Sequence, residues 1–233
     1  MTLDDTMLNI CFHGVGQPQR DLEPGEGAYW VETERFADIL DELASWPNVR
    51  ISFDDGNASD ADVALPALTE RGMKAEFFVL AGRLGAKGSV DGDGVRELRR
   101  RGMTIGSHGM HHRSWRGLTD LEAAEELDVA RDLIADAAEA PIDMAACPLG
   151  AYDRTVLRRL RERGYRHVFT SDRRRARAGT WLQSRYSVRM DDTPASLRQA
   201  LRKSRRGMVR VIRERAEVTK IGGTSGFCAN GRW

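Results

Sequence analysis

The sequence alternates short apolar runs with longer amphipathic runs from its start to about residue 190. Apolar runs of five residues, at 8–12, 49–53 and 75–79, predict buried strands. The run at 33–43 spaces Phe36, Ile39, Leu40 and Leu43 as the buried face of a helix would. Successive strand–helix units predict a parallel sheet with right-handed crossovers. At least six such units fit, a number that suits either a barrel or a doubly wound sheet.

The same alternation continues through the middle of the chain. We expect further strands at 103–106, 142–146 and 165–170, and further helices at 61–71, 94–101, 118–138 and 154–163. Thr119 is the expected N-cap of the long helix, because Glu122 stands three residues later as in a capping box. In either candidate fold, ligands gather at the C-terminal ends of the strands.

Composition excludes several classes of protein. The 233 residues are 41% hydrophobic and 30% charged, which indicates a globular chain large enough to bury a core. The three cysteines are odd in number and widely separated, so no disulfide framework is expected. No stretch approaches the roughly 18 apolar residues of a membrane span, and no signal-like segment opens the sequence. These features predict a cytoplasmic location.

Positive charge is concentrated late in the chain. Between residues 154 and 215 there are 19 arginines and 1 lysine against 5 acidic residues. Solvated helix faces would explain this excess, but it is also suited to phosphate, anionic lipid or acidic glycan. We expect a catalytic domain over 1–203 and a basic helix and flexible tail over 204–233 with possible peripheral membrane contact. Nucleic acid is not expected as a partner, because aromatic and basic residues do not interleave.

Polar residues follow the ends of three predicted strands. His13 ends the first, and Asp54-Asp55-Gly56 ends the second. Neighbouring acids on an extended chain point in different directions. One of them can therefore ligate a metal while the other faces the same site from the side. A simple turn would also account for Asp-Gly.

Histidines cluster after a later strand. His108 and His112 stand four residues apart and would share one face if this segment were helical. Two imidazoles and one carboxylate are a donor set that Zn²⁺ accepts, leaving a position for water. We therefore expect Asp55, His108 and His112 to bind a metal, and Asp54 to act as general base. A backbone N–H beside the metal would stabilise the oxyanion, and the chemistry would be hydrolysis of an amide or ester.

With these motifs the sequence resembles the polysaccharide deacetylase family, the chitooligosaccharide deacetylase-like hydrolases. Residues 52–56 (Ser-Phe-Asp-Asp-Gly) resemble its first motif, and residues 107–112 (Ser-His-Gly-Met-His-His) resemble its second. Residues 147–153 (Cys-Pro-Leu-Gly-Ala-Tyr-Asp) are similar to its third. The opening 12–16 and the run 75–79 also fit, so the likeness extends over about 8–190.

The resemblance implies an α/β fold, a distorted (β/α)7-type barrel. It also implies a divalent metal, usually zinc with cobalt, manganese or nickel as alternatives, and removal of N-acetyl or O-acetyl groups from a carbohydrate. Carried over by motif, Asp54 is the base, and Asp55, His108 and His112 are the ligands. The backbone N–H of Leu149 would contribute to the oxyanion hole. An acetylated amino sugar or glycan would be the substrate.

The sequence departs from the family pattern in three places. Ala146 stands where many members have an arginine that steadies the base, and Leu149 stands where an aromatic residue is common. No histidine follows His167, although many members have a late histidine as general acid. His13 is the alternative acid or substrate contact. A catalytically degenerate glycan-binding homologue is therefore the competing hypothesis.

Three further residues are candidate substrate contacts. Trp115 follows the histidine cluster and offers a ring on which a sugar could stack, whereas Pro148 and Tyr152 belong to the third motif.

Overall fold

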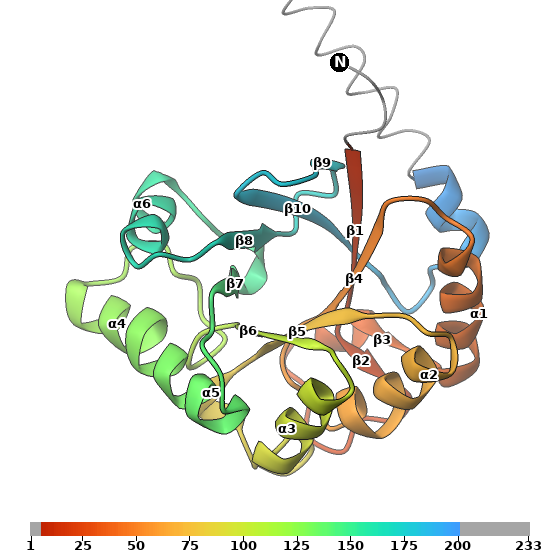
Figure 1. Ribbon diagram of the computed structural model, residues 1–233, viewed down its shortest axis with the longest axis horizontal. Helices are drawn as coiled ribbons and strands as arrows, with labels where there is room; N and C mark the ends of the chain where they lie inside the picture. Colours follow the sequence, from red (N-terminus) through yellow and green to blue (C-terminus); the bar gives the residue numbers. More distant parts are fainter. Residues whose placement is uncertain (1–5, 201–233) are drawn as a thin grey trace, which may run out of the picture. The chain divides into compact units, whose positions relative to one another are not determined.

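Seven parallel strands pair edge to edge in a closed ring in the computed structural model, which describes residues 6–200 (Figure 1). In ring order they are β1 (Thr6–Phe12), β4 (Val49–Phe53), β5 (Ala75–Val79), β6 (Thr104–Ser107), β7 (Met144–Ala146), β8 (His167–Thr170) and β10 (Leu182–Ser187).

Pairing between the first and the last strand closes the barrel. Asn9 is opposite Arg185 and Cys11 is opposite Ser187, while the other edge of β1 pairs with β4. An open doubly wound sheet would leave two edge strands, so the (β/α)7-type barrel is confirmed. Short strands accompany the ring: β9 (Ala176–Arg177) pairs antiparallel with β1, and β2 (Gly14–Val15) pairs with β3 (Trp30–Val31).

Helices follow the strands as the spacing of apolar residues predicts. They are α1 (Thr33–Ala44), α2 (Leu65–Glu70), α3 (Gly92–Arg100), α4 (Asp120–Ala124), α5 (Ala130–Ala138) and α6 (Arg154–Glu162). The four apolar residues of the predicted first helix are all buried. The capping box of Thr119 and Glu122 is present, and it begins a continuous helical segment that runs through η5 (Glu125–Val129) into α5. Short turns η2 (Glu26–Tyr29), η3 (Asp60–Ala64), η4 (Ala81–Arg83) and η6 (Pro148–Gly150) connect other elements.

Alternation along the strands makes two separate apolar layers. On the outer face Phe12, Phe53 and Phe77 stack in series, with ring centroids 5.4 and 4.7 Å apart, beneath Phe36 of α1. Each aromatic contact of this kind contributes about 0.5–1.5 kcal/mol beyond its buried area. Inside the barrel a smaller group packs together, formed by Phe78, Met144, Ala146 and Phe169.

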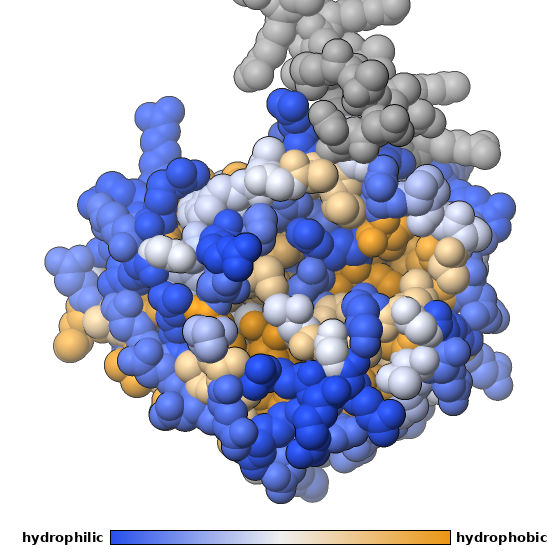
Figure 2. All heavy atoms as spheres, in the orientation of Figure 1, coloured by the Kyte–Doolittle hydropathy of each residue, from blue (hydrophilic) through white to orange (hydrophobic). Residues whose placement is uncertain are grey.

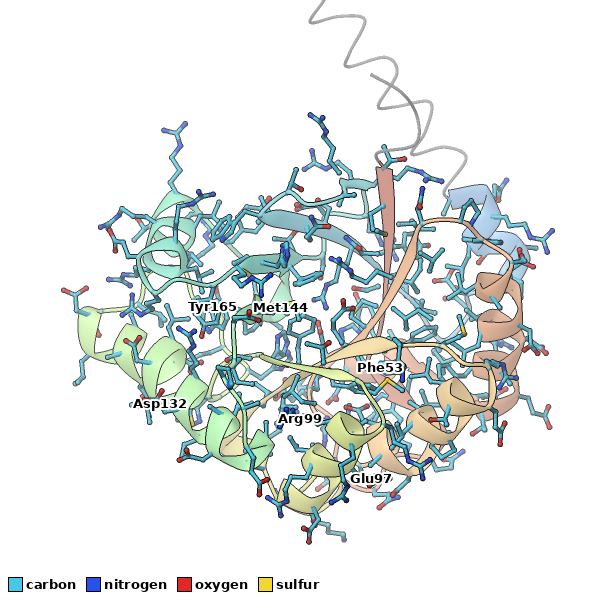
Figure 3. All side chains as sticks on the ribbon, viewed as in Figure 1. Phe53, Glu97, Arg99, Asp132, Met144 and Tyr165 are labelled. Atoms are coloured by element: carbon cyan, nitrogen blue, oxygen red, sulfur yellow. The ribbon has the colours of Figure 1, made fainter. Side chains whose placement is uncertain are left out.

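The surface follows the same division. Phe53 of the outer layer and Met144 of the inner layer are both buried, whereas Glu97 and Asp132 lie on the outer helices (Figure 3). Hydrophilic residues cover most of the periphery of the face in Figure 2, and hydrophobic residues show between the elements. Within residues 6–200, no helix combines the length and apolarity needed to cross a bilayer.

The chain divides into two units between Pro194 and Ala195. The predicted boundary at 203/204 and the predicted basic helix and tail over 204–233 lie outside the described residues.

Candidate metal centre and active site

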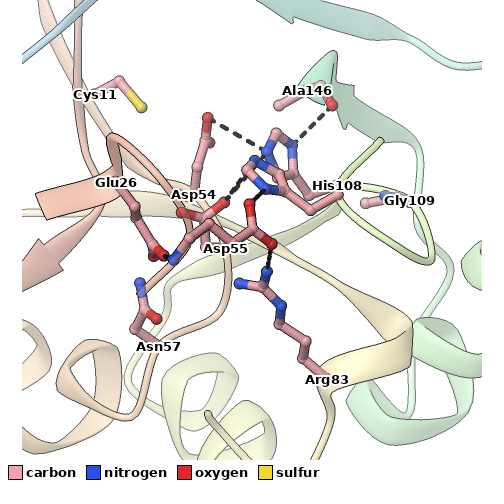
Figure 4. A network of polar contacts seen from close by, with 12 residues as sticks. Cys11, Glu26, Asp54, Asp55, Asn57, Arg83, His108, Gly109 and Ala146 are labelled. Carbon is pink, nitrogen blue, oxygen red and sulfur yellow. Dashed lines mark hydrogen bonds and ion pairs between the residues drawn. The ribbon is translucent and has the colours of Figure 1, made fainter. Parts of the chain in front are cut away.

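Two strand ends bring the predicted motifs to one place. Asp54 and Asp55 follow β4, and His108 follows β6 (Figure 4). Backbone hydrogen bonds extend the sheet by one residue on each side, from Asp54 N–H to Phe12 and from His108 N–H to Val79. All three motif side chains are at most 2% exposed. The parallel barrel therefore converts two distant motifs into one buried polar cluster.

Asp55, His108 and His112 form a three-donor group. The Nε2 atoms of His108 and His112 lie 3.5 and 3.4 Å from Asp55 Oδ1, and the ligand atoms are within 4.8 Å of one another. Both oxygens of the Asp55 carboxylate are buried without a hydrogen-bond partner among the described residues. An orphaned carboxylate is costly in a protein interior unless a cation accompanies it. The donor set and this orphaned charge fit a divalent metal such as zinc.

The outer nitrogens of the two histidines are already held. His108 Nδ1 lies 2.9 Å from the backbone oxygen of Ala146, and His112 Nδ1 lies 2.7 Å from Glu23 Oε2. A carbonyl or carboxylate at one ring nitrogen fixes the proton there and leaves the other nitrogen as a metal ligand. Glu23 is in turn paired with Arg83. Sequence reasoning missed Glu23, because it lies in a loop 89 residues from His112.

The second motif is a loop and not a helix, so His108 and His112 converge through a turn of the chain and not through a shared helix face. Gly109 and His112 both have positive φ, 87° and 51°, and the segment turns sharply between the two ligands. A Cβ on Gly109 would come within 2.5 Å of Glu126 Oε2, so only glycine fits there. Asp55 and Leu149 also have positive φ, and such strain is typical of functional sites.

Asp54 is engaged by an arginine that the sequence analysis did not identify. Nη1 and Nη2 of Arg185 donate to the two oxygens of Asp54 at 2.6 Å each, and Arg185 is fully buried. Burial alone would raise the pKa of Asp54, but Arg185, with His108 and His13, reverses this and holds the pKa below its ordinary value. Arg185 lies on β10, whose inward residues are polar, so no apolar run marked this strand in the sequence. Arg185 on β10 thus contacts Asp54, although Ala146 stands at the position where many family members have an arginine beside the base.

A cavity of about 400 Å³ opens above these groups. His13, Tyr29 and Leu149 line it together with the acidic cluster. The His13 ring packs on Tyr29 at 4.9 Å, and its buried Nδ1 has no hydrogen-bond partner within the described part of the chain. Leu149, which is 66% exposed, forms an apolar part of the cavity wall. It stands at the position where the family pattern has an aromatic residue.

A second donor group, formed by Cys11, His13 and Asp54, is less suited to a metal. Both Asp54 oxygens are occupied by Arg185. Burial raises the pKa of the Cys11 thiol well above its ordinary value, which opposes the thiolate that metals bind.

Of the three predicted substrate contacts, Trp115 needs correction. Trp115 is 1% exposed and donates its indole N–H to Glu126, which also accepts from the backbone of Met110, so Trp115 cannot stack on a sugar. It instead fastens the metal-ligand loop to the helical segment behind it. Tyr152 donates to Asp172 and Pro148 is buried, and neither lines the cavity.

Comparisons with known proteins agree with this architecture. Residues 44–168 match the family described as polysaccharide deacetylase, and the chain belongs to that family. A Bacillus subtilis (strain 168) protein, YxkH, whose name places it among polysaccharide deacetylases, is 26% identical over 150 residues. That match covers 63% of this chain and 54% of YxkH, so the chain spans about half the length of this curated relative.

Solved structures share the fold. The Streptococcus pyogenes deacetylase PplD, in complex with acetate, superposes with a TM-score of 0.71 at 19% identity, covering 84% of this chain and 98% of that one. IcaB from Ammonifex degensii superposes with a TM-score of 0.68 at 23% identity, covering 84% and 95%.

Proposed function

We propose that this protein is a metal-dependent hydrolase that removes N-acetyl groups from an acetylated amino sugar or glycan. The observation that carries the proposal is the position of Asp54, which shares one buried cluster with Asp55, His108 and His112. When bound by those three residues, a divalent cation, most suitably zinc, would lower the pKa of water and polarise the acetyl carbonyl.

The chain's own residues would divide the remaining work. Asp54 is ionised at neutral pH because Arg185 stabilises its carboxylate, so it can accept the proton of the attacking water. Arg185 also fixes the carboxylate's orientation through two bonds. The backbone N–H of Leu149 would stabilise the oxyanion at the cavity wall.

His13 is the proposed general acid. A donor nitrogen of its ring lies within 4.8 Å of an Asp54 oxygen, and the ring borders the same cavity. An imidazolium there would give its proton to the departing amine. General acids contribute about 10²–10⁴-fold to such steps, so His13→Gln should reduce turnover of N-acetyl substrates by that order.

The competing hypothesis, a degenerate glycan-binding homologue, rested on the missing motif arginine and late histidine. Arg185 on β10 and His13 directly after β1 approach Asp54 from other parts of the chain, and this favours the enzyme.

Acetate release tests the proposal. The zinc-loaded full chain, given N-acetylated and O-acetylated oligosaccharides, should release acetate, and chelation should stop it. Asp54→Asn should abolish release while one zinc per chain remains. Asp128→Asn is the matched control, because Asp128 makes a similar two-bond pair with Arg163 on the outer helices. Absence of zinc from the wild-type protein, or acetate release by Asp54→Asn, would contradict the proposal. The cytoplasmic location remains a separate prediction, which cell fractionation tests.

A further inference from the structure

The charges on the floor of the cavity nearly cancel in pairs. Asp54 is paired with Arg185, Glu23 with Arg83, and Glu26 with Arg20. The Asp55 carboxylate has no arginine partner among the described residues, and its negative charge is the one that a bound cation would balance. A floor built in this way, with a divalent ion in place, presents little net negative charge to an approaching substrate.

Two arginines stand at the rim of the cavity, beside β8 and β10. Arg173 and Arg189 are exposed, and neither forms an ion pair within residues 6–200. Some other arginines of the late, basic half are paired with acids on the outer surface, where Arg159 pairs with Asp120 and Arg163 with Asp128. Part of the positive excess seen in the sequence therefore lies close to the cavity without an acidic partner.

Both rim arginines are held in place by contacts that leave their charge available. The Arg173 guanidinium lies over the Tyr186 ring at 4.7 Å and donates to the backbone oxygen of Ser187, which lines the cavity. The backbone of Arg173 has φ 54° and donates to Arg185, a strained conformation that sets the direction of its side chain.

Arg189 is linked to the cavity through an aromatic ring. Its guanidinium lies over Tyr29 at 5.5 Å, and Tyr29 lines the cavity and packs on His13. Stacked guanidinium groups lose little freedom on binding an anion and can still donate in their own plane.

We propose that Arg173 and Arg189 form an anion subsite, so that the substrate is an acetylated sugar that also carries a phosphate or carboxylate group. This inference rests on the proposed function for the acetyl group, but the anion subsite itself can be measured without turnover. Charge-assisted bonds from two arginines would favour an anionic sugar over its neutral counterpart by tenfold or more.

Binding to the zinc-loaded full chain is the test. N-acetylglucosamine, N-acetylglucosamine 1-phosphate, N-acetylmuramic acid and inorganic phosphate would be titrated by ligand-observed NMR. The phosphate arm represents a lipid- or nucleotide-linked sugar, and the muramic acid arm represents a carboxylated one. At least one anionic sugar should bind about tenfold more tightly than both the neutral sugar and inorganic phosphate. Raising the salt concentration should reduce this preference.

Substitutions of Arg173 and Arg189 test whether these two residues cause the preference for anionic sugars. Arg173→Gln with Arg189→Gln should abolish it while leaving affinity for the neutral sugar within about twofold. Arg161→Gln is the matched control, because Arg161 stacks on Trp181 at 4.4 Å on α6, outside the cavity. Equal binding of neutral and anionic sugars, an unchanged preference in the double variant, or an equal loss in Arg161→Gln would overturn the subsite. Acetate release is measured separately, so a protein that binds anionic sugars without releasing acetate would contradict only the proposed function.

Discussion

Arg185 and Asp54 form a two-bond ion pair inside the barrel, with both N–O distances at 2.6 Å. The two residues are 131 positions apart in sequence. Arg185 lies on β10 and Asp54 directly follows β4, and these two strands both flank β1. Arg185 also donates to Ser52 and lies over the rings of Phe78 and Phe169. One guanidinium thus connects the proposed base to the inner apolar layer.

Removing Arg185 should cost both stability and activity. Arg185→Met leaves the Asp54 carboxylate buried without its partner, and such a loss costs about 3–5 kcal/mol in the free energy of unfolding. Arg163→Met, which breaks the partly exposed pair with Asp128, should cost about 1 kcal/mol or less. Urea denaturation of the two variants measures these losses in the free energy of unfolding, and acetate release measures the loss of activity. Adding Asp54→Asn to Arg185→Met should recover part of the loss, and a purely additive double variant would contradict the coupling.

Glu23 should tune the metal affinity through His112. Glu23→Gln weakens the acceptor at His112 Nδ1, and changes of this kind reduce metal affinity by about 10–100-fold. Zinc affinity by competition with a chelating dye is the measurement. Glu125→Gln is the matched control, because Glu125 makes the same kind of contact, at 3.2 Å, with His111, which is not among the proposed ligands. Equal effects of the two substitutions would argue against this role.

Glu76 should make stability depend on pH. Burial raises its pKa to about 7, and Arg50 and Arg185 offset only part of that rise. Because the folded-state pKa lies above the ordinary 4.5, the folded protein binds the extra proton. The stability that this proton contributes is complete below pH 4.5. It declines as pH rises to about 7, by at most about 3 kcal/mol.

Glu76→Gln should remove this decline, which denaturation at pH 5 and pH 8 would show. The exposed Glu162→Gln on α6 should retain it. If the wild-type protein and Glu162→Gln were each as stable at pH 8 as at pH 5, Glu76 would not cause a decline in stability.

Trp115 should act on the fold of the metal-ligand loop and not on sugar binding. Trp115→Phe removes the indole N–H bond to Glu126 and part of a buried ring, for an expected loss of about 1–3 kcal/mol. KM for a soluble acetylated oligosaccharide should stay within about twofold of the wild-type value. A large rise in KM with unchanged stability would restore the stacking role.

The sequence by itself determined the strand–helix order, the capped helix at Thr119 and the identity of the metal-ligand candidates. These features are local: apolar spacing, capping residues and motif residues are readable within a few neighbouring positions. The sequence left the conformation of 108–112 open, and Gly109 with the buried Glu126 makes this segment a turned loop.

Only the tertiary structure decided which distant residues complete the site. Arg185, Glu23 and His13 reach the cluster from strands and loops far apart in the chain, and closure of β1 on β10 is what brings Arg185 to Asp54. It also placed two of the late arginines, Arg173 and Arg189, beside the cavity. Burial and long-range charge pairing depend on how the strands close, which no local pattern of residues encodes.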